Sequence, residues 1–209
     1  MQPHPSYSIV VTSRNDSHGG NILKRMRLFV SGLIHQANAF QMPIELIFVE
    51  WNPPADRPPL HEVLPKPAPG DLLTLRYITV PAALHQRYRR RVEIPLFQMI
   101  AKNVGIRRAK HPWILATNID LIFSDPLCAI MARGDLDPGA YYRANRVDIP
   151  DGIDESMTLA EHSIGPPSTS SASMAGIPAT NSWTPASMAS RNSAPFRDGS
   201  PIRWGSATA

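Results

Sequence analysis

Two short apolar runs flank one amphipathic segment within residues 7–49, and this stretch decides the fold. The first run is YSIVVT (residues 7–12), and the second is IELIFV (residues 44–49). Compact β-branched runs of this kind are typical of buried parallel strands. Between them, apolar residues recur at helical spacing from Ile22 to Ala37. Strand, helix and strand in this order predict a right-handed βαβ unit and a parallel sheet.

The alternation of strands and helices continues beyond this unit. Strands are expected at 72–80, 113–117 and 141–147, and a helix is expected to end near residue 106 with Pro95 in its first turn. Asp125 is expected to cap a short helix. The proline-rich residues 51–70 predict a long irregular connection. The predicted fold class is therefore α/β, a Rossmann-like three-layer domain with a mostly parallel sheet.

The composition changes near residue 163. Residues 1–162 have the periodicity of a folded domain, whereas Ser, Ala, Pro, Gly, Thr and Asn dominate residues 163–209. A segment with so little apolar surface does not offset its ordering entropy, so we expect a low-complexity, disordered tail. An abrupt change in composition of this kind is expected of a truncated or frame-shifted gene product.

Charge and cysteine content limit the classes of function. The net charge of +4 suits an anionic partner without identifying it, and the arginines of residues 87–91 are expected in a solvated loop, with no nucleic-acid partner. The single cysteine, Cys128, excludes an internal disulfide. Neither a signal peptide nor an integral membrane segment is recognisable, so a cytoplasmic protein is expected.

Polar side chains follow three of the expected strands. They are the run from Ser13 to Asp16, then Glu50 with Asn52, and then Asn118 with Asp120. Because ligands of open parallel sheets bind beyond the carboxyl ends of the strands, we expect these groups to meet at one crevice. A carboxylate such as Glu50 accepts hydrogen bonds from a base or ribose, and Asp120 is the kind of oxygen ligand that holds a divalent cation against a diphosphate.

Several stretches resemble the donor-binding half of family 2-like glycosyltransferases of the GT-A fold, nucleotide-diphospho-sugar transferases. Residues 7–16 resemble the family's first strand and turn, and residues 44–52 resemble its second strand with a terminal acidic residue. AKNVGI (residues 101–106) followed by WILATNID (residues 113–120) resembles the Asn-x-Gly helix that leads into the Asp-x-Asp motif. The resemblance covers residues 7–150.

The resemblance implies a protein that binds a nucleoside-diphosphate sugar through a metal-bridged diphosphate and transfers the sugar to an unknown acceptor. Mn²⁺ or Mg²⁺ is the implied cofactor, with Asp120 as its ligand and Asn118 facing the donor sugar. Asn118 replaces one carboxylate of the usual pair, which weakens the metal site. The implied nucleotide-binding residues are Ser13, Arg14, Asn15, Glu50 and Asn103.

The family's catalytic base belongs to an acceptor half that is not recognisable in this sequence, so no catalytic residue is assigned. Two alternatives therefore stay open. One is a truncated, non-catalytic remnant that binds a nucleotide sugar, and the other is a different nucleotide-binding α/β enzyme, such as a nucleotidyltransferase.

Overall fold

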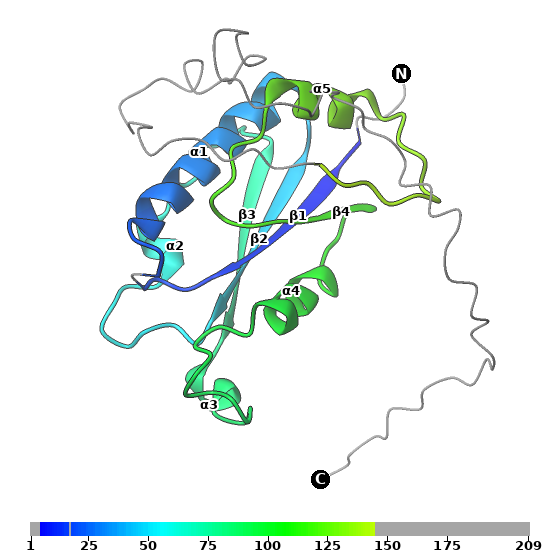
Figure 1. Ribbon diagram of the computed structural model, residues 1–209. Helices are drawn as coiled ribbons and strands as arrows, with labels where there is room; N and C mark the ends of the chain where they lie inside the picture. The colour runs from blue at the N-terminus through cyan, green and yellow to red at the C-terminus, as the bar shows by residue number, and fades with distance from the viewer. Residues whose placement is uncertain (1–4, 17, 145–209) are drawn as a thin grey trace, which may run out of the picture.

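The computed structural model describes residues 5–16 and 18–144. Its centre is a four-stranded, wholly parallel sheet with the strand order β3-β2-β1-β4 (Figure 1). The strands are β1 (Tyr7–Ser13), β2 (Ile44–Trp51), β3 (Leu73–Val80) and β4 (Trp113–Ala116). The expected α/β class and parallel sheet are confirmed. Residues 141–144 form no strand, and the rest of the expected strand at 141–147 lies outside the described residues, as does the expected tail.

Five helices connect or follow the strands in the described part of the chain. They are α1 (Ile22–Ala39), α2 (Leu60–Val63), α3 (Ala82–His85), α4 (Gln98–Ile106) and α5 (Asp125–Arg133). None of them is long and apolar enough to cross a membrane. The short α2 lies within the connection that was expected to be irregular throughout.

Two expected helix starts are wrong. Helix α4 begins at Gln98, and Pro95 precedes it with its carbonyl bound by Arg14 Nη1 at 3.0 Å. That contact fixes Pro95 in the irregular segment before α4, so the helix starts later than its apolar pattern predicts. At α5, Ser124 occupies the N-cap position and Asp125 lies in the first turn. A negative charge in the first turn interacts favourably with the helix dipole.

The sheet separates two apolar cores, which gives three layers. Side chains of β1 alternate, so Ile9 and Val11 face the core beneath α1 and α5 while Val10 faces the core beneath α4. Figure 1 shows α1 and α5 on one side of the sheet and α4 on the other. The α1 core also contains Cys128 of α5, which is fully buried, and this burial raises the pKa of its thiol to about 12.

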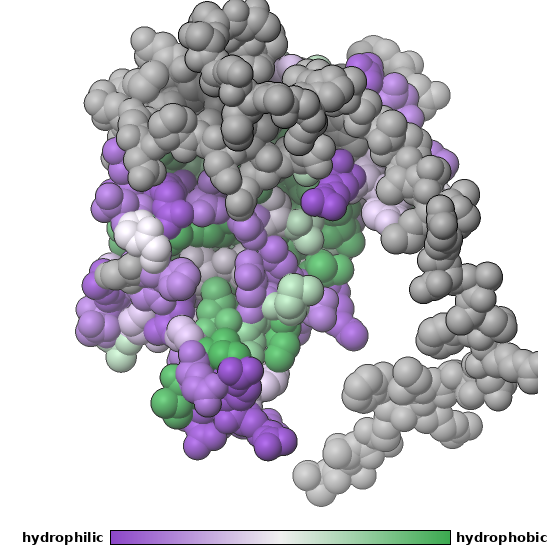
Figure 2. Space-filling model, viewed as in Figure 1, coloured by the Kyte–Doolittle hydropathy of each residue, from purple (hydrophilic) through white to green (hydrophobic). Residues whose placement is uncertain are grey.

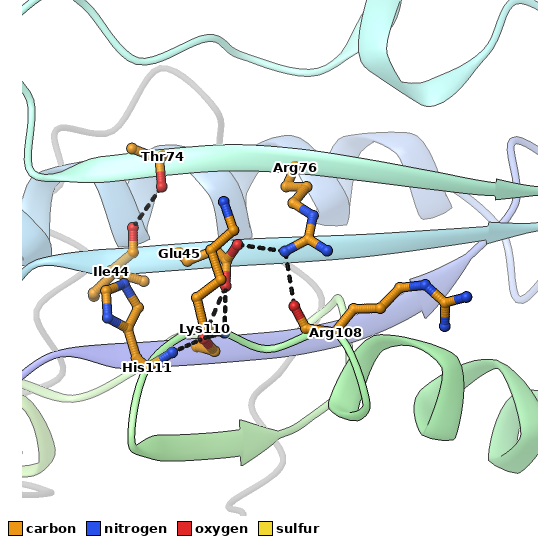
Figure 3. Close-up of polar contacts among 8 residues, drawn as sticks. Ile44, Glu45, Thr74, Arg76, Arg108, Lys110 and His111 are labelled. Carbon is orange, nitrogen blue, oxygen red and sulfur yellow. Dashed lines mark hydrogen bonds and ion pairs between the residues drawn. The ribbon is translucent and has the colours of Figure 1, made fainter.

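A buried polar cluster fixes the amino ends of the strands (Figure 3). Glu45 accepts hydrogen bonds from Arg76 Nη1 at 2.8 Å and from Ser8 Oγ at 2.9 Å. The backbone N–H of Lys110 donates to both Ser8 Oγ and Glu45 Oε2 at 3.2 Å, and Arg76 also bonds the carbonyl of Arg108 at 2.8 Å. Burial raises the pKa of Glu45, but these hydrogen bonds outweigh it and leave the pKa lowered. The cluster ties the turn between α4 and β4 to the sheet.

The segment that carries α3 projects from the carboxyl end of β3, and Figure 2 shows hydrophilic residues gathered over it. Trp51 Nε1 donates to Nδ1 of the buried His85 at 2.9 Å. Since an indole nitrogen only donates, the imidazole proton lies on Nε2, which is 2.9 Å from the carbonyl oxygen of Arg91. This bridge holds the segment in place. The arginine side chains of residues 87–91 are exposed on it, as expected for a solvated loop.

Candidate functional site

The carboxyl ends of the strands form one edge of the sheet, and the connections leave this edge in opposite directions. The chain passes from β1 to β2 through α1 on one face and from β3 to β4 through α4 on the other. The strand order therefore reverses between β1 and β4, which makes the end of these two strands the topological switch point. Open α/β sheets bind their ligands at such points.

Glu50 lies at this edge, at the end of β2 and directly opposite Ser13 of β1. Its side chain is fully buried. One carboxylate oxygen accepts a hydrogen bond from the backbone N–H of Leu60 at 3.0 Å, while Oε2 has no hydrogen-bond partner among the described residues. Desolvation raises the pKa of Glu50, although the bond from Leu60 and the nearby His61 oppose the rise. Buried, incompletely bonded carboxyl groups of this kind are concentrated at functional sites.

Arg14 and Asn15 brace the loops around Glu50. Arg14 forms an ion pair with Asp16 at 3.0 Å and also bonds the carbonyl of Pro95. Asn15 Nδ2 donates to the carbonyl of Pro58 at 2.7 Å and is itself buried. Together with the bond from Leu60 to Glu50, this contact closes the loop after β2 over the Glu50 carboxylate. The present partners of Arg14 and Asn15 are thus mainly backbone carbonyls of neighbouring loops.

The side chains of Asn118 and Asp120 diverge. Asn118 Oδ1 accepts hydrogen bonds from Gln98 Nε2 and Lys102 Nζ of α4, both at 3.2 Å. Asp120 Oδ2 instead lies 2.7 Å from Arg25 Nη1 of α1. Because α1 and α4 cover opposite faces of the sheet, the two residues that were expected to serve one donor site are bound to different layers.

Asp120 does not have the surroundings of a divalent cation site. Arg25, besides the ion pair with Asp120, donates from Nη2 to the carbonyls of Gly19 and Gly20 at 3.1 Å each, so its guanidinium is held in place. No group of three or more His, Cys, Asp or Glu side chains that could hold a metal lies within residues 5–16 and 18–144. A guanidinium held in place on the Asp120 carboxylate does not fit Mn²⁺ or Mg²⁺ at this position.

An open pocket of about 540 Å³ lies at the carboxyl end of β4. Its volume is within the usual range for small-molecule sites. Lys102 of α4 and Arg143, which returns from the loop after α5, supply two positive charges to its lining, and Thr117 and Asn118 add neutral polar groups. Within the described part of the chain, no carboxylate forms an ion pair with Lys102 or Arg143. Burial lowers the pKa of Lys102.

The pocket contains residues that the sequence interpretation missed. Asn103, which was expected to line the nucleotide site, is exposed on α4, and its neighbour Lys102 reaches Asn118. One signal for Lys102 was available, since Gln98 and Lys102 are one helical turn apart and share a face. Arg143 had no such signal, because an irregular loop brings it back to β4.

Of the predicted nucleotide-binding residues, Ser13 and Glu50 lie side by side, with Arg14 and Asn15 in the adjoining loop. Comparison of the chain with protein-family models, with curated proteins and with solved structures finds no match. What is established is therefore the architecture, a parallel α/β domain whose four strands have the order 3-2-1-4 and whose polar edge lies at the switch point.

Proposed function

We propose that this domain binds a nucleoside-diphosphate sugar at the carboxyl edge of its sheet and transfers the sugar to an acceptor hydroxyl, as a glycosyltransferase does. The observation that carries the proposal is the cationic pocket at the end of β4, beside the switch point. The resemblance of residues 101–120 to the donor-binding elements of such transferases supports the same conclusion.

The diphosphate occupies the pocket between Lys102 and Arg143, since lysine and arginine are the side chains that bind phosphate oxygens most strongly. Asn118 faces the donor sugar. Ser13, Arg14, Asn15, Glu50 and Asn103 are the proposed nucleotide contacts.

In the transfer, the acceptor oxygen forms a bond to the anomeric carbon as the bond from that carbon to the diphosphate breaks. The electron pair of the breaking bond stays on the departing diphosphate. Positive side chains beside that group stabilise the developing charge, which is how such sites lower the barrier. The acceptor hydroxyl loses its proton to a base, and no described residue is assigned to that role.

Thermal melts with a panel of nucleoside diphosphates and their sugars test the proposal, each ligand being measured once with Mn²⁺ and once with EDTA. A ligand at a hundred times its dissociation constant adds about 2.7 kcal/mol, which corresponds to a rise of roughly 5–10 °C in Tm for a domain of this size. We expect one nucleotide family to give this rise. Transfer or hydrolysis of the bound donor, followed by release of the nucleoside diphosphate, then tests catalysis.

Three outcomes would count against the proposal. If no nucleoside diphosphate or nucleotide sugar shifts the melt with Mn²⁺ or with EDTA, the domain does not bind this donor class. A shift confined to nucleoside triphosphates, with incorporation of their label, would indicate a nucleotidyltransferase. Binding of a nucleotide sugar without any turnover over a range of acceptors would leave a non-catalytic binding domain.

A further inference from the structure

We propose that this site neutralises the diphosphate with Lys102 and Arg143 and does not require a divalent cation at Asp120. The inference rests on the proposed function and specifies how its donor is held. It follows from the positively charged side chains that contact Asn118 and Asp120, the two polar residues of the stretch 118–120.

The Asp120 carboxylate already has a cationic partner. Arg25 approaches it at 2.7 Å, and the same guanidinium bonds the carbonyls of Gly19 and Gly20. Both glycines have positive φ angles, of 68° and 64°, and these turn their carbonyls into a loop that receives the guanidinium. A metal ion that bound Asp120 would have to displace Arg25 from all three acceptors, or lie beside it against charge repulsion.

Asn118 offers no second ligand for such an ion. Its carbonyl oxygen is directed to α4, where it accepts from Gln98 and from the ammonium of Lys102 at 3.2 Å. Both ends of the expected metal motif are therefore bonded to cations from opposite faces of the sheet. A divalent ion between them would meet positive charge on both sides.

The same arrangement suits an anion. The ammonium of Lys102 is partly buried next to the neutral amide of Asn118, and no carboxylate among residues 5–16 and 18–144 forms an ion pair with it. Burial lowers its pKa. Arg143 lines the same pocket from the loop after α5. One cation for each phosphate of a diphosphate replaces the charge that a metal ion would supply, and the planar guanidinium can bond two phosphate oxygens at once.

Calorimetric titration of the protein with the nucleoside diphosphate that shifts the melt tests the inference, in EDTA and in Mn²⁺. We expect the Kd in EDTA to stay within about twofold of the Kd in Mn²⁺, a difference well under 1 kcal/mol. Lys102→Gln and Arg143→Gln are each expected to raise the Kd about tenfold or more, as for the loss of a charge-assisted hydrogen bond. Lys66→Gln, at an exposed lysine before β3, is the matched control and should leave the Kd unchanged.

The variants are expected to fold, because Lys102→Gln removes a partly buried charge and Arg143 is exposed. Circular dichroism checks this before each titration. Binding that needs Mn²⁺ and disappears in Asp120→Asn would overturn the inference while the proposed function stands. Binding in EDTA that neither variant weakens would also overturn it, because the diphosphate would then lie elsewhere. No binding under either condition would instead refute the proposed function.

Discussion

At the residue scale, two glutamates on the same strand have pKa values that their surroundings shift in opposite directions. Glu45, at the amino end of β2, has hydrogen bonds to both carboxylate oxygens and a lowered pKa. Glu50, near the carboxyl end, is fully buried with one oxygen unbonded within the described part of the chain, and its pKa is raised. Native proteins keep a buried, incompletely bonded carboxyl group chiefly where function requires it, which supports the proposed site at the carboxyl edge of the sheet.

Glu50→Gln is expected to stabilise the protein at neutral pH. An acid with a raised pKa in the folded state contributes stability below its ordinary value of 4.5 and loses it as the pH rises through the raised pKa. Replacing the acid by a neutral amide should therefore increase the free energy of unfolding at pH 7 by on the order of 1 kcal/mol, with little difference at pH 4.

Urea unfolding at both pH values measures this effect. The control is Glu62→Gln, since Glu62 is on α2 beside Glu50 but has 58% of its side chain exposed, and it should change stability little. A Glu50→Gln variant that is less stable than the wild type at pH 7 would contradict the expectation. Weaker nucleotide binding by the more stable variant would place Glu50 in the nucleotide site.

Glu45→Gln is expected to act in the opposite direction. Because the pKa of Glu45 is lowered, its ionised form contributes stability above the ordinary value of 4.5, and this contribution is lost as the pH falls through the lowered pKa. The variant should lose about 1–3 kcal/mol at pH 7 and progressively less in acid. Glu93→Gln removes an exposed pair with Arg90, where 66% of the glutamate side chain is accessible, so it should be nearly neutral. If the two variants lowered the free energy of unfolding equally, the buried cluster around Glu45 would contribute no more stability than an exposed ion pair.

At the scale of elements, the contact between α4 and the sheet positions Lys102. Ala101 and Gly105 face the sheet, and a Cβ atom at residue 105 would overlap Val10 Cγ1 and lie 3.1 Å from Val49 Cγ2. The glycine thus allows the helix to approach two strands closely. Any residue with a side chain would push α4 outward, together with the lysine that it carries to the pocket.

Gly105→Ala should therefore lower the free energy of unfolding by about 1–3 kcal/mol, although alanine is the better helix former. Gly32→Ala on α1 is the matched substitution, since no atom lies within 4 Å of the added Cβ. It should raise stability by about 0.5–1 kcal/mol. Denaturant unfolding of both variants measures these changes in the free energy of unfolding. A gain in stability for Gly105→Ala would show that α4 does not approach Val10 and Val49 so closely in solution.

Helices and strands were largely predictable because their apolar periodicity reports which side is buried. The stripe from Ile22 and the run at residues 44–49 correspond to α1 and β2. The start of α4 was not predictable, since it depends on Arg14 binding the carbonyl of Pro95, a contact between residues far apart in sequence. The divergence of Asn118 and Asp120 was equally hidden, because side-chain direction at a strand end depends on which helices pack beside it.

At the scale of the whole molecule, the gathering of polar residues at one edge of the sheet was predictable because parallel strands place their carboxyl ends together. Ser13 and Glu50 do lie opposite one another across β1 and β2. The charge of the pocket was not predictable in the same way. It depends on Arg143, which a loop carries back to β4, and on Lys102, whose role depends on the direction in which Asn118 points.

The single cysteine makes the domain its own reporter of unfolding. Cys128 is fully buried, and burial raises the pKa of its thiol to about 12. Alkylation requires the thiolate to attack the reagent, so a thiol-alkylating reagent should not modify the native protein. Only molecules in which the domain has opened and exposed the thiol are then modified. When opening and reclosing are fast compared with alkylation, the rate of modification is proportional to the fraction of open molecules. A bound nucleotide at a hundred times its Kd should slow alkylation about a hundredfold. The buried thiol thus measures ligand affinity without a label and without any knowledge of the acceptor.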